Sequence, residues 1–162
     1  MANYYDEMAD GYDALHGEEQ IKKYSLIKKS LDISSHETIL DIGHGSGIIA
    51  AVFEENDITG IDNSEKLLEK SRCRTINWDF NDLPLPFEDD SFDTVLCVTA
   101  FHHSYDFNVL AKEIKRIARS KVAVSLLKKS PSIEEQKNAL KSIFESAEFE
   151  NIGIDILMTV LL

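Results

Sequence analysis

The sequence of 162 residues predicts a single α/β domain, a doubly wound, mostly parallel sheet of six or seven strands with helices on both faces. Apolar runs of strand length alternate with segments of helical periodicity, which is typical of repeated strand–helix–strand units. No linker, internal repeat or low-complexity tract divides the chain, so one domain over 1–162 is expected, with an N-terminal lid and helix (1–31) and an α/β core (32–162). The chemically distinctive residues follow the apolar runs, and such sheets bind ligands at the carboxyl ends of their strands.

Five apolar runs and a C-terminal segment are expected to form the sheet. The runs are 38–41, 58–61, 75–78, 94–98 and 122–127. The segment 152–162 is expected to be the last strand or a bent pair of strands. The acidic connection 81–93 contains prolines and has no helical period, so we expect a loop there.

Helices are expected between these runs. The predicted segments are 18–31, 48–55, 64–71, 107–118 and 132–147. Ser64 is a candidate N-cap for the third segment, because its hydroxyl can accept a hydrogen bond from the first helical turn. Leu110, Ile114 and Ile117 recur at helical spacing in the fourth segment, and Pro131 and Ser132 form a start signal for the fifth.

Composition and charge narrow the class of partner. The formal net charge of -12 opposes a general attraction to nucleic acid or anionic lipid, which depends mainly on Lys and Arg. No apolar run reaches the roughly 18 residues that would span a membrane. The N-terminal stretch is acidic and aromatic, unlike a signal peptide, so a cytoplasmic protein is expected. The expected partner is a small molecule, and the sequence does not indicate an oligomeric state.

The two cysteines carry no metal-site pattern. Cys73 and Cys97 are far apart in the sequence and lack the spacing of metal ligands. Cys97 lies inside an apolar run. Buried free thiols are therefore expected, in preference to a disulfide or a nucleophile, and no metal is expected.

The stretch ILDIGHGSG, residues 39–47, ends an apolar run with one acid and three glycines. Glycines at alternate positions indicate a bend that needs positive φ or a close approach to the backbone. The dinucleotide fingerprint G-x-G-x-x-G fits only from Gly45, with Ala50 as its last small residue, and leaves Gly43 unexplained. A frame that starts at Asp41 uses every glycine, and a carboxylate there repels a pyrophosphate and suits a cationic ligand. A glycine-rich turn without a ligand is the remaining alternative.

Two further acids follow the next two strands. Asp62 lies 21 residues after Asp41, where an acid can accept hydrogen bonds from both hydroxyls of a ribose. Asp79 follows the third strand, where its carboxylate can accept from an exocyclic amino group while the backbone of Phe80 reads the adenine edge. Alone, Asp62 would be read as an exposed loop acid, and a solvated loop residue is the alternative reading of Asp79. Together they predict an adenosine site without a phosphate binder, which points to S-adenosylmethionine.

These motifs, in this order, resemble the class I S-adenosylmethionine-dependent methyltransferases. The chain is most similar to the small methyltransferase-domain branch that includes ubiquinone and menaquinone biosynthesis methyltransferases. The stretches that carry the resemblance are YYDEMADGYDALHGEEQ, ILDIGHGSG, GIDNS, WDFNDLPLPFEDDSFDTVLC, AFHH and LAKEIKRIAR. The resemblance covers nearly the whole chain and implies a Rossmann-like fold.

The resemblance also implies a role for each matching residue. The methionine moiety would be held by Asp41, Gly43, Gly45 and Gly47, the ribose by Asp62 with Asn63 beside it in the same motif, and the adenine by Asp79 and Phe80. Tyr12 would lie near the amino-acid end of the cofactor, although packing of a lid explains such a tyrosine equally well.

Three departures from the family concern substrate recognition and oligomeric state. RSKVAV replaces the usual Lys-Pro-Gly-Gly turn before the fifth strand, and the usual long insertion after that strand is reduced to KKSPS. The chain stops at Leu162, where a further antiparallel strand is expected.

His102 and His103 follow the fourth strand at the open face, where a histidine can act as general base if the acceptor must lose a proton. The sequence does not distinguish the two, and a structural role is the alternative. Glu113 and Arg116 are expected to form an i,i+3 helix pair. The motifs for methylating a nucleobase amino group, cytosine C5 or arsenite are absent, which leaves a small-molecule O-, N- or C-acceptor.

Two other functions remain open at this point. A non-catalytic module that binds the cofactor and partners a larger enzyme would explain the small size and the missing substrate cap. A nicotinamide-dependent oxidoreductase would require the weaker dinucleotide reading of the glycine loop.

Overall fold

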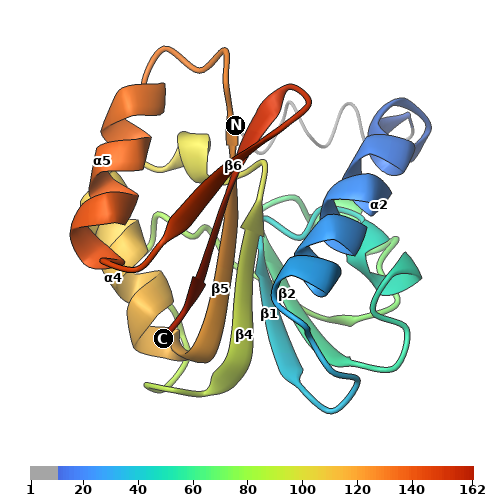
Figure 1. Ribbon diagram of the computed structural model, residues 1–162. Coiled ribbons are helices and arrows are strands. Elements are labelled where there is room, and N and C mark those ends of the chain that lie inside the picture. Colours follow the sequence, from blue (N-terminus) through green and yellow to red (C-terminus); the bar gives the residue numbers. More distant parts are fainter. Residues whose placement is uncertain (1–10) are drawn as a thin grey trace.

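The computed structural model describes residues 11–162 and, for Tyr12 and Leu15, the backbone alone. Its centre is a seven-stranded sheet of order β3-β2-β1-β4-β5-β7-β6 (Figure 1). The strands are β1 (Thr38–Ile42), β2 (Asp57–Asp62), β3 (Arg74–Asn77), β4 (Phe92–Val98), β5 (Ala118–Leu127), β6 (Glu148–Ile152) and β7 (Asp155–Leu161). The helices are α2 (Tyr12–Ser30), η1 (Ile48–Ala51), α3 (Glu65–Leu68), η2 (Phe101–His103), α4 (Phe107–Ile117) and α5 (Ile133–Ile143).

The sheet is doubly wound and mostly parallel, as predicted. β1 pairs in parallel with both β2 and β4, β2 with β3, and β4 with β5. The strand order therefore reverses between β1 and β4, and a doubly wound sheet binds its ligand outside the carboxyl ends of the strands at such a switch point. β7 is antiparallel to β5, and β6 is antiparallel to β7.

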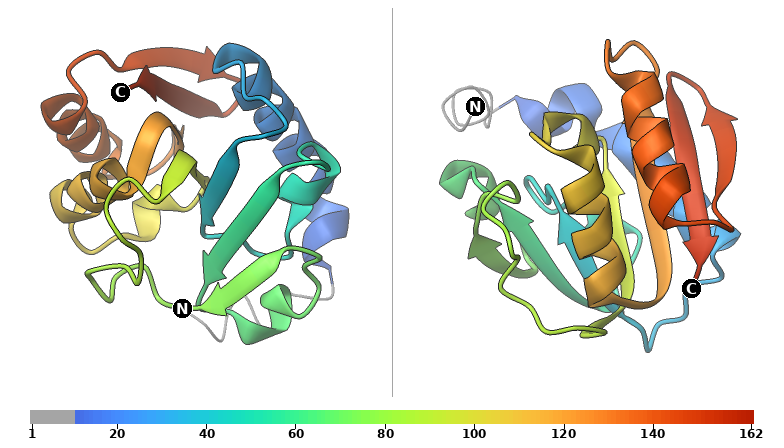
Figure 2. Two further views of the ribbon diagram at one scale, coloured as in Figure 1. Left: turned by 90° about the horizontal axis from the view of Figure 1, so that it is seen from below. Right: turned by 90° about the vertical axis from the view of Figure 1, so that its left-hand side faces the viewer.

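Helices cover both faces of the sheet, which confirms the predicted layering. Figures 1 and 2 show α4 and α5 on one face and α2 on the other. The side chains of β4 alternate between the two cores. Val95 and Cys97 pack with α4 residues such as Leu110, whereas Leu96 and Val98 pack with the face that α2 covers. This period of two is what a strand buried on both faces requires.

The C-terminal segment differs from its prediction. The expected helix 132–147 ends at Ile143, and a strand, β6, begins at Glu148. The expectation that a further antiparallel strand is missing is wrong, because β6 and β7 form a hairpin around Gly153, whose φ is 60°. Phe149 faces Met158 across this hairpin and packs on the core, which favours the strand over a longer helix.

Two helices on one flank of the sheet are much shorter than predicted. The expected helix 48–55 is the four-residue η1, and the expected helix 64–71 is the four-residue α3. Ser64 is the N-cap of α3, as predicted, and its Oγ accepts from the backbone N–H of Leu67. After η1 the chain turns so that Phe53 is fully buried, with its ring edge-to-face against Tyr24 of α2. Conversely, α2 begins at Tyr12, earlier than residue 18.

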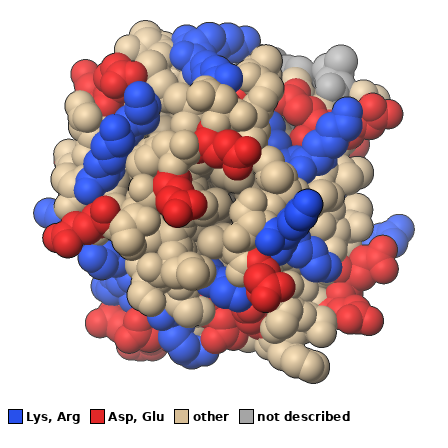
Figure 3. All heavy atoms as spheres, in the orientation of Figure 1, with Lys and Arg blue, Asp and Glu red and all other residues tan. Residues whose placement is uncertain are grey.

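The surface carries charges of both signs. Figure 3 shows acidic and basic side chains interspersed over one face of the molecule. Within residues 11–162 no helix has the length and apolar character needed to cross a membrane. Glu113 and Arg116 form the expected pair, with Arg116 Nε 3.0 Å from Glu113 Oε2.

Candidate functional site

The glycine loop after β1 is a bend that depends on three glycines. Gly43, Gly45 and Gly47 have φ values of 74°, 58° and 82°, a region that favours glycine. A Cβ added to Gly43 would lie 2.4 Å from the Cβ of Ala100, at the end of β4. The loop is fastened to β2, because the backbone N–H groups of Gly43 and His44 both donate to the carbonyl oxygen of Ile61.

A pocket lies at the carboxyl ends of β1 to β4, where the winding reverses. It brings together most of the residues predicted from the sequence, namely Gly43, Gly45, Asp62, Asn63, Asp79, Phe80 and His103. Leu67, Asn81, Val98, Thr99, Ala100 and Tyr105 complete the lining. Three predicted residues, Asp41, Gly47 and His102, do not line it. The side chain of Tyr12 lies outside the part of the chain that the structure describes.

Asp62 is held at the end of β2 by two backbone donors. The N–H of Gly45 donates to its Oδ2 and the N–H of Ser64 to its Oδ1, both at 2.9 Å. Burial raises the pKa of this carboxyl, and these two donors lower it again in part. Each carboxylate oxygen keeps a further lone pair with which to accept a hydrogen bond from a ligand hydroxyl.

Asp79 is positioned after β3 by two asparagines. Its Oδ1 accepts from the backbone N–H of Asn81 at 2.9 Å and from Nδ2 of the same residue at 3.1 Å. Its Oδ2 is 3.4 Å from Nδ2 of Asn63. The Asn81 amide also donates to the carbonyl oxygen of His103 and accepts from the N–H of Tyr105, so it joins the segments after β3 and β4. The sequence analysis missed Asn81, although an Asn two residues after an Asp is a turn signal.

Asp41 lies behind the glycine loop, which changes its expected contact with the methionine moiety. Its side chain is fully buried. The hydroxyl of Tyr24 is 3.2 Å from each carboxylate oxygen, and Nδ1 of His44 is 2.8 Å from Oδ2. Asp41 therefore fixes the loop from within, and its effect on a bound cofactor would pass through His44 and the adjacent backbone.

The two histidines after β4 differ in position. His103 lines the pocket, whereas His102 has a buried Nδ1 for which no partner appears among the described residues. The centroids of their imidazole rings lie 4.0 Å apart. Burial, together with His103, lowers the pKa of His102 to about 4, and burial lowers that of His103. Both rings are therefore neutral near pH 7, which is the state a general base needs.

A buried ion pair next to the pocket was not foreseen. Lys23 of α2 lies 2.5 Å from Oδ2 of Asp155, and it donates to Oγ1 of Thr99 at 3.0 Å. Thr99 lines the pocket with a φ of 54°, unusual for a β-branched residue, and its N–H donates to Ser125 Oγ at 2.7 Å. Strained backbone of this kind concentrates at functional sites. The sequence could not predict the positive φ of Thr99, because tertiary packing imposes it and no local pattern marks it.

The chemistry of the lining decides which ligand the pocket suits. Among the described residues, its polar side chains are carboxylates, amides, a hydroxyl, a phenol and an imidazole, with neither Lys nor Arg. Such a lining offers no cation to a pyrophosphate, and it suits a nucleoside that carries positive charge. No group of His, Cys, Asp and Glu within residues 11–162 is arranged to hold a metal ion.

Comparison with known proteins identifies the family. Residues 40–126 match the family described as "Methyltransferase domain". The chain belongs to this methyltransferase-domain family. Its cofactor is S-adenosylmethionine, and the donor set of the pocket fits that group, because acids are available to its hydroxyl and amino groups and no cation opposes its sulfonium.

Individual relatives are distant. The chain is 27% identical over 139 residues to the demethylmenaquinone methyltransferase of Thermotoga maritima, which is 78% of this chain and 60% of that protein. It therefore spans less than two thirds of that relative's length. A Haloferax volcanii methyltransferase, solved with the Trm112 methyltransferase activator, superposes with a TM-score of 0.76 at 18% identity, over 97% of this chain and 96% of that one. A methyltransferase from Thermotoga maritima gives 0.71 at 17% identity, over 99% of each chain.

Proposed function

We propose that this methyltransferase-domain chain transfers the methyl group of S-adenosylmethionine to a small-molecule O-, N- or C-acceptor. The observation that carries the proposal is that Asp62 and Asp79 line one pocket beside Gly43 and Gly45, with no cationic side chain in its described lining. The cofactor supplies a methyl group already activated by a sulfonium, so the protein mainly binds, aligns and excludes water. The cytoplasmic location expected from the sequence stays a prediction.

The proposed roles follow the ends of the strands. Asp62 accepts hydrogen bonds from the ribose hydroxyls. Asp79 accepts from the adenine amino group, with Asn63 steadying its carboxylate and the Phe80 backbone at the base edge. The backbone of Gly43 and Gly45 holds the methionine moiety, and Asp41 and Gly47 act through the shape of the loop.

His103 is the proposed general base for acceptors that must lose a proton. It lines the pocket, and burial keeps its imidazole neutral near pH 7. The ring of His102 packs against that of His103, outside the pocket lining, and is proposed to hold the His103 ring in place rather than to touch the acceptor. Tyr12 remains a candidate for the amino-acid end of the cofactor.

The test is transfer of a labelled methyl group to a panel of small metabolites, with Asp62→Ala and Asp57→Ala compared. Asp57 begins the strand that Asp62 ends, and it is exposed, so the control removes the same carboxylate at the opposite edge of the sheet. We expect turnover with at least one acceptor and its loss in Asp62→Ala alone. Equal turnover by the two variants would contradict the proposed site.

The second candidate is a cofactor-binding subunit that turns over only with a partner. It is favoured by one relation: the Haloferax volcanii neighbour, which matches this chain over nearly its full length, was solved in a complex with an activator. Tight cofactor binding without turnover across the panel, followed by turnover once a partner is added, would support it. Enhanced NADH fluorescence on mixing would support the oxidoreductase reading instead, and we expect none.

A further inference from the structure

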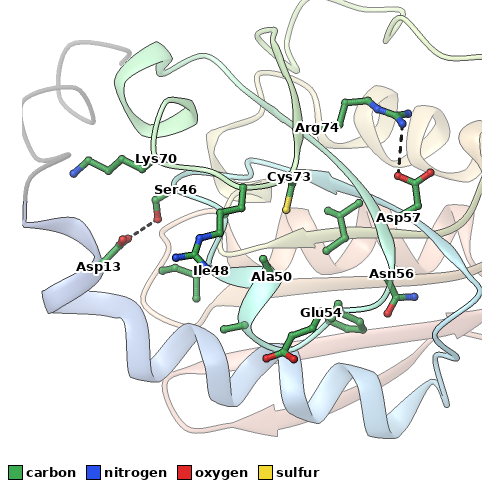
Figure 4. A pocket seen from close by; sticks show the side chains of 15 residues that line it. Asp13, Ser46, Ile48, Ala50, Glu54, Asn56, Asp57, Lys70, Cys73 and Arg74 are labelled. Carbon is green, nitrogen blue, oxygen red and sulfur yellow. Dashed lines mark hydrogen bonds and ion pairs between the residues drawn. The ribbon is translucent and has the colours of Figure 1, made fainter.

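The helix that follows the glycine loop has a single turn. It is η1, with four residues, and a hollow of about 790 Å³ lies beside it (Figure 4). The last residues of the loop, Ser46 and Gly47, line this hollow together with Ile48. Cys73 also lines it and is half-buried, whereas Cys97 is buried as predicted. On this side the loop is held by polar contacts rather than by the packing of a long helix.

A buried row of polar side chains runs through His44, in the middle of the loop. Its Nδ1 is 2.8 Å from Oδ2 of Asp41, and its Nε2 is 2.7 Å from Oγ of Ser71. Oγ of Ser71 also accepts from the backbone N–H of Cys73 at 3.1 Å, so the far end of the row is itself fixed. At the near end the hydroxyl of Tyr24 donates to Asp41. The row therefore joins α2, the loop after β1 and the segment before β3.

Two glycines make room for the imidazole of His44. A Cβ on Gly60 of β2 would lie 2.2 Å from the ring. A Cβ on Gly47 would lie 2.5 Å from Oγ of Ser71 and 3.0 Å from Nε2 of His44. The ring therefore packs directly on backbone. Its orientation is fixed by packing as well as by hydrogen bonds.

The charge of Asp41 favours an imidazolium at His44. Burial by itself lowers the pKa of His44, but the hydrogen bond to the Asp41 carboxylate outweighs burial, and the pKa is raised to about 9. Near pH 7 both ring nitrogens therefore carry hydrogen, and the ring donates to Asp41 and to Ser71 at once. Hydrogen bonds from a charged donor to a carboxylate are the stronger kind.

The ring supports the part of the loop that would touch the methionine moiety. His44 lies between Gly43 and Gly45, which both line the cofactor pocket. A second contact of the loop, from Ser46 Oγ to Oδ1 of Asp13 in α2, is made to an exposed carboxylate (Figure 4). Because water competes for an exposed acid, the buried row through His44 is the firmer support. Loss of the ring should displace the two peptides around it first.

The acids proposed for the ribose and the adenine have supports of their own. Asp62 keeps the backbone N–H of Ser64 on Oδ1 even where Gly45 is displaced. Asp79 is held by the backbone and the side chain of Asn81. The adenosine half of the pocket therefore depends less on His44 than the methionine half does.

We propose that His44 is a positioning residue for the methionine half of the cofactor, because the row Asp41–His44–Ser71 fixes the backbone of the glycine loop. The side chain of His44 makes the affinity of the pocket depend on whether a ligand carries the amino-acid end. This inference rests on the proposed role of the loop and goes beyond it, since His44 itself does not line the pocket.

The test compares two ligands by calorimetric titration. S-adenosylhomocysteine carries the amino-acid end, methylthioadenosine lacks it, and both carry the adenosine. His44→Ala should weaken the binding of S-adenosylhomocysteine by about tenfold or more, and that of methylthioadenosine by no more than about threefold. Equal losses for the two ligands would give His44 a general structural role and overturn the proposal, as would unchanged affinity for both.

Two further variants serve as controls. His36→Asn, a change at an exposed histidine before β1, should leave both affinities unchanged. Asp62→Ala should weaken both ligands alike, because both carry the ribose. A wrong role for His44 and a wrong assignment of the pocket therefore give different patterns: the first spares the effect of Asp62→Ala, and the second abolishes it.

Ser71→Ala decides should His44→Ala fail to fold. It removes only the outer contact of the ring and leaves the pair with Asp41 in place. We expect the same selective loss for S-adenosylhomocysteine, smaller than in His44→Ala. An unchanged ratio of the two affinities in folded Ser71→Ala overturns the proposal.

Discussion

The backbone N–H of Gly45 donates to Oδ2 of Asp62 at 2.9 Å, which joins the glycine loop after β1 to the end of β2. The same carboxylate accepts from Ser64 through its other oxygen. The residue that would read the ribose therefore also fixes the loop that would hold the methionine moiety. Both parts of the pocket depend on the register between β1 and β2, in which Asp41 lies opposite Gly60.

Gly43→Ala should destabilise the fold. The new Cβ would lie 2.4 Å from Ala100, and φ at this position is 74°. The positive φ alone costs on the order of 1 to 3 kcal/mol for a residue other than glycine. The control is Gly17→Ala in α2, where a Cβ would meet nothing within 4 Å. Urea denaturation should show a loss of stability for Gly43→Ala and none for Gly17→Ala.

Lys23→Met should destabilise the chain by about 3 to 5 kcal/mol, because it leaves the fully buried Asp155 without its cation. The double variant Lys23→Met/Asp155→Leu should recover much of that loss, since no charge then remains buried. Thermal or chemical denaturation of the three proteins forms the test. Equal stability of the single variant and the wild type would show that the ion pair does not contribute to the free energy of unfolding.

Stability should fall as pH rises from neutral to alkaline, because of His44. Its pKa in the folded chain is raised to about 9, above the unfolded value of about 6.5. The stabilisation is therefore fully present below pH 6.5 and is lost as pH rises through 9, by about 3 kcal/mol. Urea denaturation of the wild type across this pH range should show the slope, and the slope should flatten in a His44→Asn variant.

His103→Asn should lower kcat by about 10² to 10⁴-fold for an acceptor that must lose a proton, with KM nearly unchanged. Because burial lowers the pKa of His103, wild-type activity should persist below pH 6.5 before it falls. His36→Asn serves as the control. A full kcat in His103→Asn, with such an acceptor, would remove His103 from the proposed chemistry.

The sequence predicted the central strands well because most side chains of β1, β4 and β5 are buried on both faces of the sheet. Runs such as 94–98 show no helical periodicity, so they were predicted as strands. Their alternation with helical segments then predicted a mostly parallel sheet. Helix lengths failed at 48–55 and 64–71, where apolar spacing suited a helix but the burial of Phe53 and the short path to β3 left room for one turn.

The candidate site was predicted from local sequence motifs. The prediction failed where a residue's position depends on contacts with residues far away in the sequence. Asp62 and Asp79 line one pocket as expected, because the ends of adjacent parallel strands meet at one edge of the sheet. The burial of Asp41 depends on Tyr24, 17 residues earlier, and on the side chain of His44. The pair Lys23–Asp155 joins helix and strand 132 residues apart by their numbering, beyond the reach of any local pattern.

The most direct measurement is calorimetric titration of the wild type, Asp62→Ala and Asp57→Ala with S-adenosylmethionine. The wild type and Asp57→Ala should bind with equal affinity, and Asp62→Ala should bind more weakly by about 1 to 3 kcal/mol, since the ribose hydroxyls lose a charged acceptor. Binding by Asp62→Ala as tight as that of the wild type would contradict the assignment of this pocket to the cofactor.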